Sequence, residues 1–180
     1  MEYGIIVLVA ILVIFIIWFI STSNSLNRSI VKIEEASSGI DVALTKRYDT
    51  LTKMVEVVKS YAKHEKDTIF EVIKLRQNMT TAEQIDANNK MSNNLEKIYA
   101  LAENYPELKS SENYNTLQKS IADAEEHLQA ARRMYNSNVS IYNQKLVTFP
   151  TSIIANSKGL TKKTFFEAEE TKKEDIKIDL

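Results

Sequence analysis

The sequence predicts an all-α membrane protein, with an N-terminal transmembrane helix followed by an antiparallel bundle of three long helices and a short fourth helix. The first residues form an unbroken apolar run, and later apolar residues recur every three or four positions, which is the spacing of a helix face. The 180 residues include 3 Gly and 2 Pro, far below the average usage of about 7% and 5%. This scarcity disfavours turn-rich β folds and the glycine-rich phosphate loops of nucleotide-binding folds.

Residues 1–23 are predicted to form the transmembrane anchor. An uncharged apolar run begins at Ile5 and ends at Ile20, and with its flanks it forms a helix of about 30 Å, the thickness of a bilayer core. Tyr3 and Trp18 lie near its two ends, where interfacial aromatic residues are enriched. A cleaved signal peptide is the alternative, since residues 21–23 resemble a cleavage site, but such peptides begin with basic residues and none precedes this run. The lipid bilayer is therefore the first expected partner.

The charges beside the anchor predict its orientation. Arg28 and Lys32 are the nearest basic residues and both follow the anchor. The positive-inside tendency then places the bundle in the cytoplasm and the N-terminus outside, in a single pass of the cell membrane. Glu34 and Glu35 balance these two charges, so the opposite orientation stays open.

The bundle is expected to cover residues 24–160. Two apolar rows of the first helix repeat every seven residues over about five heptads, which predicts coiled-coil packing. One row contains Leu26, Ile33, Ile40, Met54 and Tyr61, and the other contains Ile30, Leu44, Leu51 and Val58. Thr80 and Glu83 have the spacing of a capping box that opens the second helix, and Pro106 closes it. Pro150 ends the third helix, and Gly159 is a candidate C-terminal cap of the fourth. The expected helices span about residues 24–78, 81–105, 111–149 and 152–157.

The connections between these expected helices are short. Linkers of about three to six residues predict antiparallel neighbours. The first helix would reach about 75 Å and the second about 35 Å. The first helix must therefore bend, or pack part of its length on the third helix or on another protomer. Residues 161–180 are expected to form a docked segment and then a flexible charged tail.

Motifs for catalysis and metal binding are incomplete in this sequence. The absence of cysteine excludes disulfides, thiolate catalysis and cysteine-ligated zinc. His64-Glu65 begins like the HExxH motif of zinc proteases, but Thr68 stands where the second histidine belongs. His127 lacks a glutamate three residues before it, so the Glu-x-x-His pattern of bundle metal sites fails too. We expect no enzyme activity and no cofactor, and a net charge of −1 gives no attraction to nucleic acid.

A Tyr-Asn pair occurs twice, one heptad apart, at Tyr135-Asn136 and Tyr142-Asn143. Asn138 lies in an otherwise apolar row between them. In one interpretation the tyrosines fill core positions while their hydroxyls reach polar partners, and the asparagine sets the register of the helices. In the other, the repeat forms a polar and aromatic groove that binds a partner helix.

Arg47 interrupts an apolar row of the first helix, close to Asp49. A charged side chain at such a position either extends to water or pairs with a carboxylate. Glu125 and Asp123 are the candidate partners.

Several of these motifs, in this order, resemble the LemA family of bacterial membrane proteins. They are Ile40-Asp41, Leu44-Thr45-Lys46-Arg47-Tyr48-Asp49, residues 55–65, Tyr105-Pro106-Glu107-Leu108-Lys109-Ser110, Arg133-Met134-Tyr135-Asn136, Tyr142-Asn143, Phe149-Pro150 and Phe165-Phe166-Glu167. The resemblance implies a helical bundle on an N-terminal anchor with no established activity, and with relatives associated with magnetosome membranes. No catalytic or metal-binding set carries over. The chain departs from the family pattern at two places. The family usually has a tryptophan a few residues before the Ile-Asp pair, where this chain has Ser37-Ser38-Gly39, and a Pro-Asn after Tyr-Asp, where this chain has Thr52-Lys53.

These observations favour a membrane-anchored interaction or scaffold protein. Its expected partner is another membrane protein or a second copy of the chain. The alternative is an accessory or regulatory subunit of a membrane enzyme, such as an envelope peptidase, and a metal or catalytic role for His64 with Glu65 is a third hypothesis. The candidate residues of a partner-binding or inter-helix polar motif are Asp41, Arg47, Asp49, His64, Glu65, Tyr135, Asn136, Asn138, Tyr142, Asn143, Phe149 and Pro150.

Overall fold

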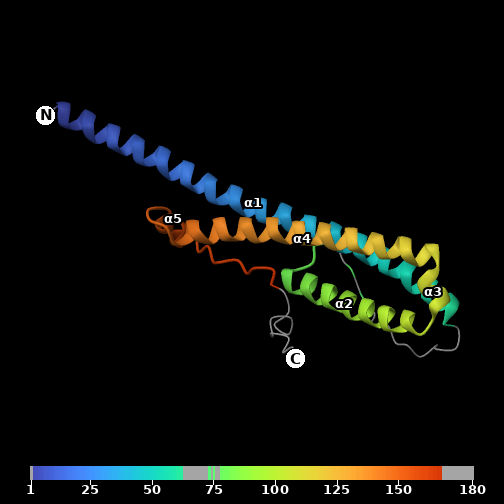
Figure 1. Ribbon diagram of the computed structural model, residues 1–180. Coiled ribbons are helices and arrows are strands. Elements are labelled where there is room, and N and C mark those ends of the chain that lie inside the picture. The colour runs from blue at the N-terminus through green and yellow to red at the C-terminus, as the bar shows by residue number, and fades with distance from the viewer. Residues whose placement is uncertain (1, 63–72, 74, 76–77, 168–180) are drawn as a thin grey trace, which may run out of the picture. The chain divides into compact units, whose positions relative to one another are not determined.

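The computed structural model describes residues 2–62, 73, 75 and 78–167, and every regular element among them is a helix (Figure 1). The helices are α1 (Glu2–Tyr61), α2 (Thr81–Glu103), α3 (Pro106–Ser110), α4 (Glu112–Val147) and α5 (Thr151–Ser157). The predicted all-α class, with a long apolar N-terminal helix followed by further helices, is confirmed.

Helix α1 joins the expected anchor and the expected first bundle helix into one helix of 60 residues. It ends at Tyr61, well before the expected boundary near residue 78. Ile73, Leu75 and Asn78 lie outside helices, and Asn78 has a positive φ of 58°. The apolar spacing that continues to residue 77 therefore does not mark a helix at these positions, although the intervening residues 63–72, 74, 76 and 77 lie outside the described part of the chain.

Among the described residues, none covers the apolar start of α1. Its most apolar stretch of 18 residues has a mean hydropathy of 3.2, and none of it is buried. Ile5 and Ile20 are 64% and 52% exposed, and the Phe15 and Trp18 rings contact each other at 5.6 Å between centroids. By length and composition this helix can cross a membrane. A core helix of a soluble protein would bury such side chains, each worth about 1.5–3 kcal/mol, so the exposure indicates membrane anchoring.

The chain divides into two compact units, and α1 and α4 contribute to both. The first unit contains Met1–Ala36 and Met134–Phe165, and the second contains Ser37–Arg133 and Phe166–Leu180.

In the first unit, α4 runs antiparallel to α1. The Asn138 side-chain amide donates to the Lys32 carbonyl at 3.1 Å, and the Lys145 ammonium donates to the Ser25 hydroxyl at 2.9 Å. A later residue of α4 thus lies beside an earlier residue of α1, as the sequence predicts for neighbouring helices. The buried apolar side chains of this unit include Leu26, Ile33, Tyr135, Val139, Tyr142, Leu146 and Ile154.

In the second unit, α2 runs parallel to α1, which corrects the expectation that neighbouring helices are antiparallel. Gln84 near the start of α2 binds Ser37 and Asp41, whereas Ser92, two turns later, binds Arg47. The core of this unit includes Ile40, Leu44, Leu51, Met54, Val58, Met91, Ile98, Leu108, Tyr114, Ile121 and Leu128.

The length of the connection explains this direction. Nineteen residues separate Tyr61 from Thr81, and an extended chain of that length spans up to about 63 Å. Returning from Tyr61 to the level of Ser37 requires about 36 Å along the helix axis. The expectation of a short linker was wrong because α1 ends early, and a longer connection permits a parallel neighbour.

The helix ends follow the capping signals of the sequence. The Thr80 hydroxyl accepts from the Glu83 amide, and the Glu83 carboxylate accepts from the Thr80 amide at 2.8 Å, which completes a capping box. Pro106 occupies the first turn of the short helix α3, which the sequence did not predict. Gly159 follows α5 with φ of 64°, the left-handed conformation that glycine adopts without strain.

Candidate functional site

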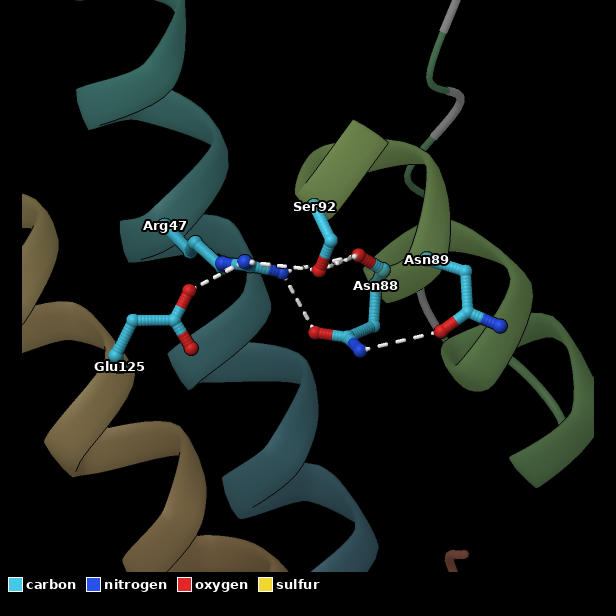
Figure 2. Close-up of polar contacts among 5 residues, drawn as sticks. All are labelled: Arg47, Asn88, Asn89, Ser92 and Glu125. Carbon is cyan, nitrogen blue, oxygen red and sulfur yellow. Dashed lines mark hydrogen bonds and ion pairs between the residues drawn. The ribbon is translucent and has the colours of Figure 1, made fainter. Parts of the chain in front are cut away.

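Arg47 lies at the centre of a polar cluster formed by α1, α2 and α4 in the second unit. Figure 2 shows its guanidinium between Asn88 and Ser92 on one side and Glu125 on the other. One terminal nitrogen donates to the Asn88 side-chain oxygen at 2.6 Å and to the Asn88 carbonyl at 3.0 Å. The other donates to the Ser92 hydroxyl at 3.2 Å and forms an ion pair with Glu125. Arg47 is 3% exposed, so a single side chain joins three helices in the interior.

The electrostatics of this cluster follow from burial. Loss of water around the guanidinium lowers the pKa of Arg47, and the Glu125 carboxylate opposes that shift. The side chain nevertheless remains charged, because its ordinary pKa lies far above neutral pH. Of the two expected partners, Glu125 pairs with Arg47, while Asp123 pairs with Lys46 at 2.5 Å on the surface. The hydrogen bond from Lys46 lowers the pKa of Asp123.

A second buried polar group lies one turn before this cluster. Gln84 is fully buried, and its amide nitrogen donates to the Ser37 hydroxyl at 3.2 Å and to an Asp41 carboxylate oxygen at 2.8 Å. This contact accounts for the predicted residue Asp41. The predicted residue Asp49 is exposed on α1 and takes no part in the Arg47 cluster.

The polar side chains of α2 that bind α1 were not among the residues predicted from the sequence. Gln84, Asn88 and Ser92 follow one another at intervals of four, so they share one face of the helix. Their spacing of four residues could have predicted a polar face on α2. In the structure this face contacts the row of α1 that contains Arg47.

A pocket of about 450 Å³ opens beside the Arg47 cluster within the second unit. Arg132 lines it, and its guanidinium stacks over the Phe166 ring at 4.6 Å. The Nε of Arg132 is buried and has no hydrogen-bond partner among the described residues. Burial and the nearby charge of Arg47 lower the pKa of Arg132. The other lining residues include Asn89, Leu95, Glu96, Tyr99 and Gln129.

The Tyr-Asn repeat binds a later segment of its own chain in the first unit. The Tyr135 and Tyr142 hydroxyls donate to the carbonyls of Thr164 and Thr161, each at 3.2 Å. The Asn143 side chain donates to the Lys163 carbonyl and accepts from the Lys163 amide, both at 2.9 Å.

These contacts fit the first of the two interpretations of the repeat, in which the tyrosines fill core positions. Tyr135 and Tyr142 are 3% and 1% exposed, so their rings are core side chains, and burial raises the pKa of Tyr142. Residues 161–164 bind the polar side chains that, in the second interpretation, would form a groove for a partner helix. Asn136 is half-buried on the same helix, and Asn138 binds the backbone of α1 as described above.

The remaining candidate residues lie elsewhere. Phe149 and Pro150 are exposed at the turn between α4 and α5, and Phe149 is 77% exposed. His64 and Glu65 lie outside the described residues. His127 is exposed near Asp123, at 3.8 Å. Within the described ranges, no three His, Asp or Glu side chains are grouped in a way that could hold a metal ion.

Comparison with known proteins gives matches along most of the chain. The model of the LemA family matches residues 36–180. The protein LemA of Metamycoplasma hominis is 27% identical over 169 residues, which cover 91% of this chain and 77% of that protein. The magnetosome protein MamQ of Magnetospirillum gryphiswaldense is 24% identical over 82 residues, covering 46% of this chain and 30% of that protein.

Proposed function

Because this chain belongs to the LemA family, we propose that it is a single-pass membrane protein whose helical bundle is a binding module for another membrane protein, without enzymatic activity. The pocket beside Arg47 carries the proposal, because it contains a buried guanidinium nitrogen that lacks an acceptor. A buried donor without a partner costs about 1–3 kcal/mol. A partner that supplies an acceptor there would remove this penalty.

The chemistry of the pocket selects the partner group. The pocket holds two guanidinium groups, Arg47 and Arg132, and two carboxylates, Glu96 and Glu125. Arg47 is paired with Glu125, so the planar cation of Arg132 is the group left to bind a partner. A carboxylate from a partner helix or loop fits this arrangement, because arginine binds carboxylates through paired, charge-assisted hydrogen bonds. Phe166 holds the guanidinium plane in place for that contact.

The absence of enzymatic activity is part of the proposal, and the bonding of Arg47 supports it. Both of its terminal nitrogens are already bonded to Asn88, Ser92 and Glu125. Its role is therefore to hold three helices together rather than to contact a reacting group.

The anchor supports a single span with the bundle in the cytoplasm. Among the described residues, α1 is the one helix long and apolar enough to cross a bilayer. Arg28 and Lys32 follow its apolar run directly. Basic residues on the flank of a span favour the cytoplasmic side.

Site-specific crosslinking tests the partner pocket. A photoreactive amino acid at Gln129, on the pocket wall, should form one discrete adduct in native membranes. The adduct should disappear in Arg132→Gln but persist in Arg133→Gln, which removes the same charge from an exposed neighbouring position. Circular dichroism must show that both variants are folded. Equal adducts in the two variants, or only a smear of unrelated neighbours, would exclude the pocket as a binding site.

Cysteine labelling tests the orientation, and the chain has no cysteine of its own to interfere. Lys119→Cys places a thiol on the exposed face of the bundle, and Glu2→Cys places one before the apolar run. In intact cells a membrane-impermeant maleimide should label the second variant and leave the first unlabelled until the cells are permeabilised. The reverse pattern would place the bundle outside.

A further inference from the structure

We propose that the first unit contains a binding site for the phosphate of an anionic phospholipid headgroup, in a basic pocket at the point where α1 leaves the membrane. The pocket has a volume of about 400 Å³ and is lined by Arg28, Lys32 and Lys145 together with Ser21, Ser25 and Ser29. The proposal rests on the single span proposed above, because the span sets the depth of the pocket.

The charges of the pocket point to an anion. Three cationic side chains share it, and no carboxylate is among its lining residues. The Lys145 ammonium is held by neutral groups, the Ser25 and Ser29 hydroxyls, each at 2.9 Å. Like charges that line one pocket repel one another, and an anion bound between them removes that repulsion. Phosphate oxygens accept hydrogen bonds from guanidinium and ammonium groups, so a phosphate fits the donor set.

The depth of the pocket favours a lipid as the source of that phosphate. With a rise of 1.5 Å per residue, Ser25 lies about 8 Å beyond Ile20, and Arg28 about 12 Å beyond it. The headgroup layer on each face of a bilayer is about 5–8 Å thick. Side chains of a helix lean toward its N-terminus, so Arg28 and Lys32 lean toward the membrane.

Exposed apolar side chains near the pocket also indicate that a membrane surface lies beside it. Lys158 binds the Ser23 hydroxyl, and Lys145 binds Ser25, so the chain between these two lysines passes beside the end of the anchor. Along that stretch Val147, Phe149 and Ile153 are 63%, 77% and 57% exposed. Exposed apolar residues beside basic ones are the composition of segments that rest on bilayer interfaces. A lipid surface gives these side chains an apolar environment that water does not.

The single tryptophan of the chain provides a direct test. Trp18 lies two residues before the end of the apolar run, so lipids bound at the pocket are within range to quench its fluorescence when their acyl chains are brominated. Full-length protein is reconstituted in nanodiscs of phosphatidylcholine with a minority of either brominated phosphatidylglycerol or brominated phosphatidylcholine. Quenching by the brominated phosphatidylcholine measures insertion of the anchor into the bilayer. Any additional quenching by the brominated phosphatidylglycerol measures preferential binding of that lipid at the pocket.

We expect excess quenching in the wild-type protein and its loss in Arg28→Gln/Lys32→Gln. Because each basic residue at a membrane surface contributes about a fivefold factor, the relative affinity should fall more than tenfold. Lys53→Gln/Lys119→Gln, which removes the same charge from exposed positions outside the pocket, should retain it. Lys145→Gln should reduce the excess as well, with circular dichroism as the check on its fold.

Three results would overturn the proposal. Equal quenching by the two lipids in the wild type would exclude a headgroup preference, and an unchanged excess in Arg28→Gln/Lys32→Gln would place it elsewhere. Binding of millimolar inorganic phosphate to the pocket without any lipid preference would assign the site to free phosphate. Failure of the anchor itself is distinguishable, since then neither brominated lipid would quench Trp18.

Discussion

Replacing Arg47 with methionine removes the charge that joins α1, α2 and α4 while keeping a side chain of similar length. The substitution leaves the Asn88 carbonyl and side-chain oxygens and the Ser92 hydroxyl without their donor. It also leaves the Glu125 carboxylate without its partner. Removing one member of a buried ion pair destabilises a protein by about 3–5 kcal/mol.

The exposure of Glu125 places the expected value at the lower end of that range. Its side chain is 33% exposed, whereas that of Arg47 is 4% exposed, so water can solvate the carboxylate once the guanidinium is gone. We expect Arg47→Met to lower the free energy of unfolding by about 3 kcal/mol. At about 2–4 °C per kcal/mol for a chain of this size, the Tm should fall by about 6–12 °C.

The measurement is thermal and urea unfolding of the full-length protein in detergent micelles, followed by circular dichroism at 222 nm. Lys46→Met is the matched control, because the Lys46–Asp123 pair lies one residue away but is exposed on both sides, and such pairs contribute little. Arg47→Met/Glu125→Gln should be less destabilised than the sum of its single substitutions, since no unpaired charge remains. A Tm of Arg47→Met equal to or above that of the wild type would refute a stabilising role for the cluster.

Two further predictions concern the Tyr-Asn repeat. Asn143→Leu removes both hydrogen bonds to the Lys163 backbone. Hydrogen exchange of the Lys163 amide should therefore accelerate by about tenfold or more, whereas the control Gln144→Leu should leave the exchange rate unchanged. Equal protection of this amide in both variants would contradict the contact. Burial raises the pKa of Tyr142 above its ordinary value of 10.0, so its contribution to stability is complete below about pH 10 and is lost as the pH rises further, because the unfolded chain releases its phenolic proton first. Tyr142→Phe should therefore reduce the fall in unfolding free energy above about pH 10, and an unchanged slope in denaturant titrations would show that this hydroxyl does not titrate with unfolding.

The faces of the helices were predictable from the spacing of apolar residues. Leu26, Ile33, Ile40 and Met54 belong to one predicted row, and all four are buried. Periodicity succeeds here because the hydrogen bonds of a helix are local, so the sequence sets which side chains share a face. Tyr61 belongs to the same row yet is 39% exposed.

The direction of α2 was not predictable in the same way. A periodic apolar row reads alike in both directions, so it carries no information on whether a neighbouring helix is parallel or antiparallel. That choice depends on where α1 ends and how far the following connection reaches. The expectation of short linkers failed there because the apolar spacing continues past Tyr61 without a helix at Ile73 and Leu75.

The candidate site was likewise only partly predictable from the sequence. The sequence indicated that Arg47 either extends to water or pairs with a carboxylate, with Glu125 and Asp123 as the candidate partners. These two residues lie two positions apart on α4 and so point to different faces, and only the rotation of α4 against α1 determines which one reaches the guanidinium. The partners of Asn143 lie in an irregular segment twenty residues later, where no periodic pattern exists to reveal them.

The sequence by itself determined the helical class, the apolar anchor, the buried faces and the family, because each depends on local spacing or on motifs in order along the chain. The tertiary structure decided the parallel course of α2, the pairing of Arg47 with Glu125 and the occupation of the Tyr-Asn repeat by residues 161–164. It also brought Lys145 to the end of the anchor, beside Ser25 and 120 residues away in the chain. Such contacts depend on packing between distant segments, whose free energy is set by the shape and polarity of both surfaces rather than by the pattern of either one.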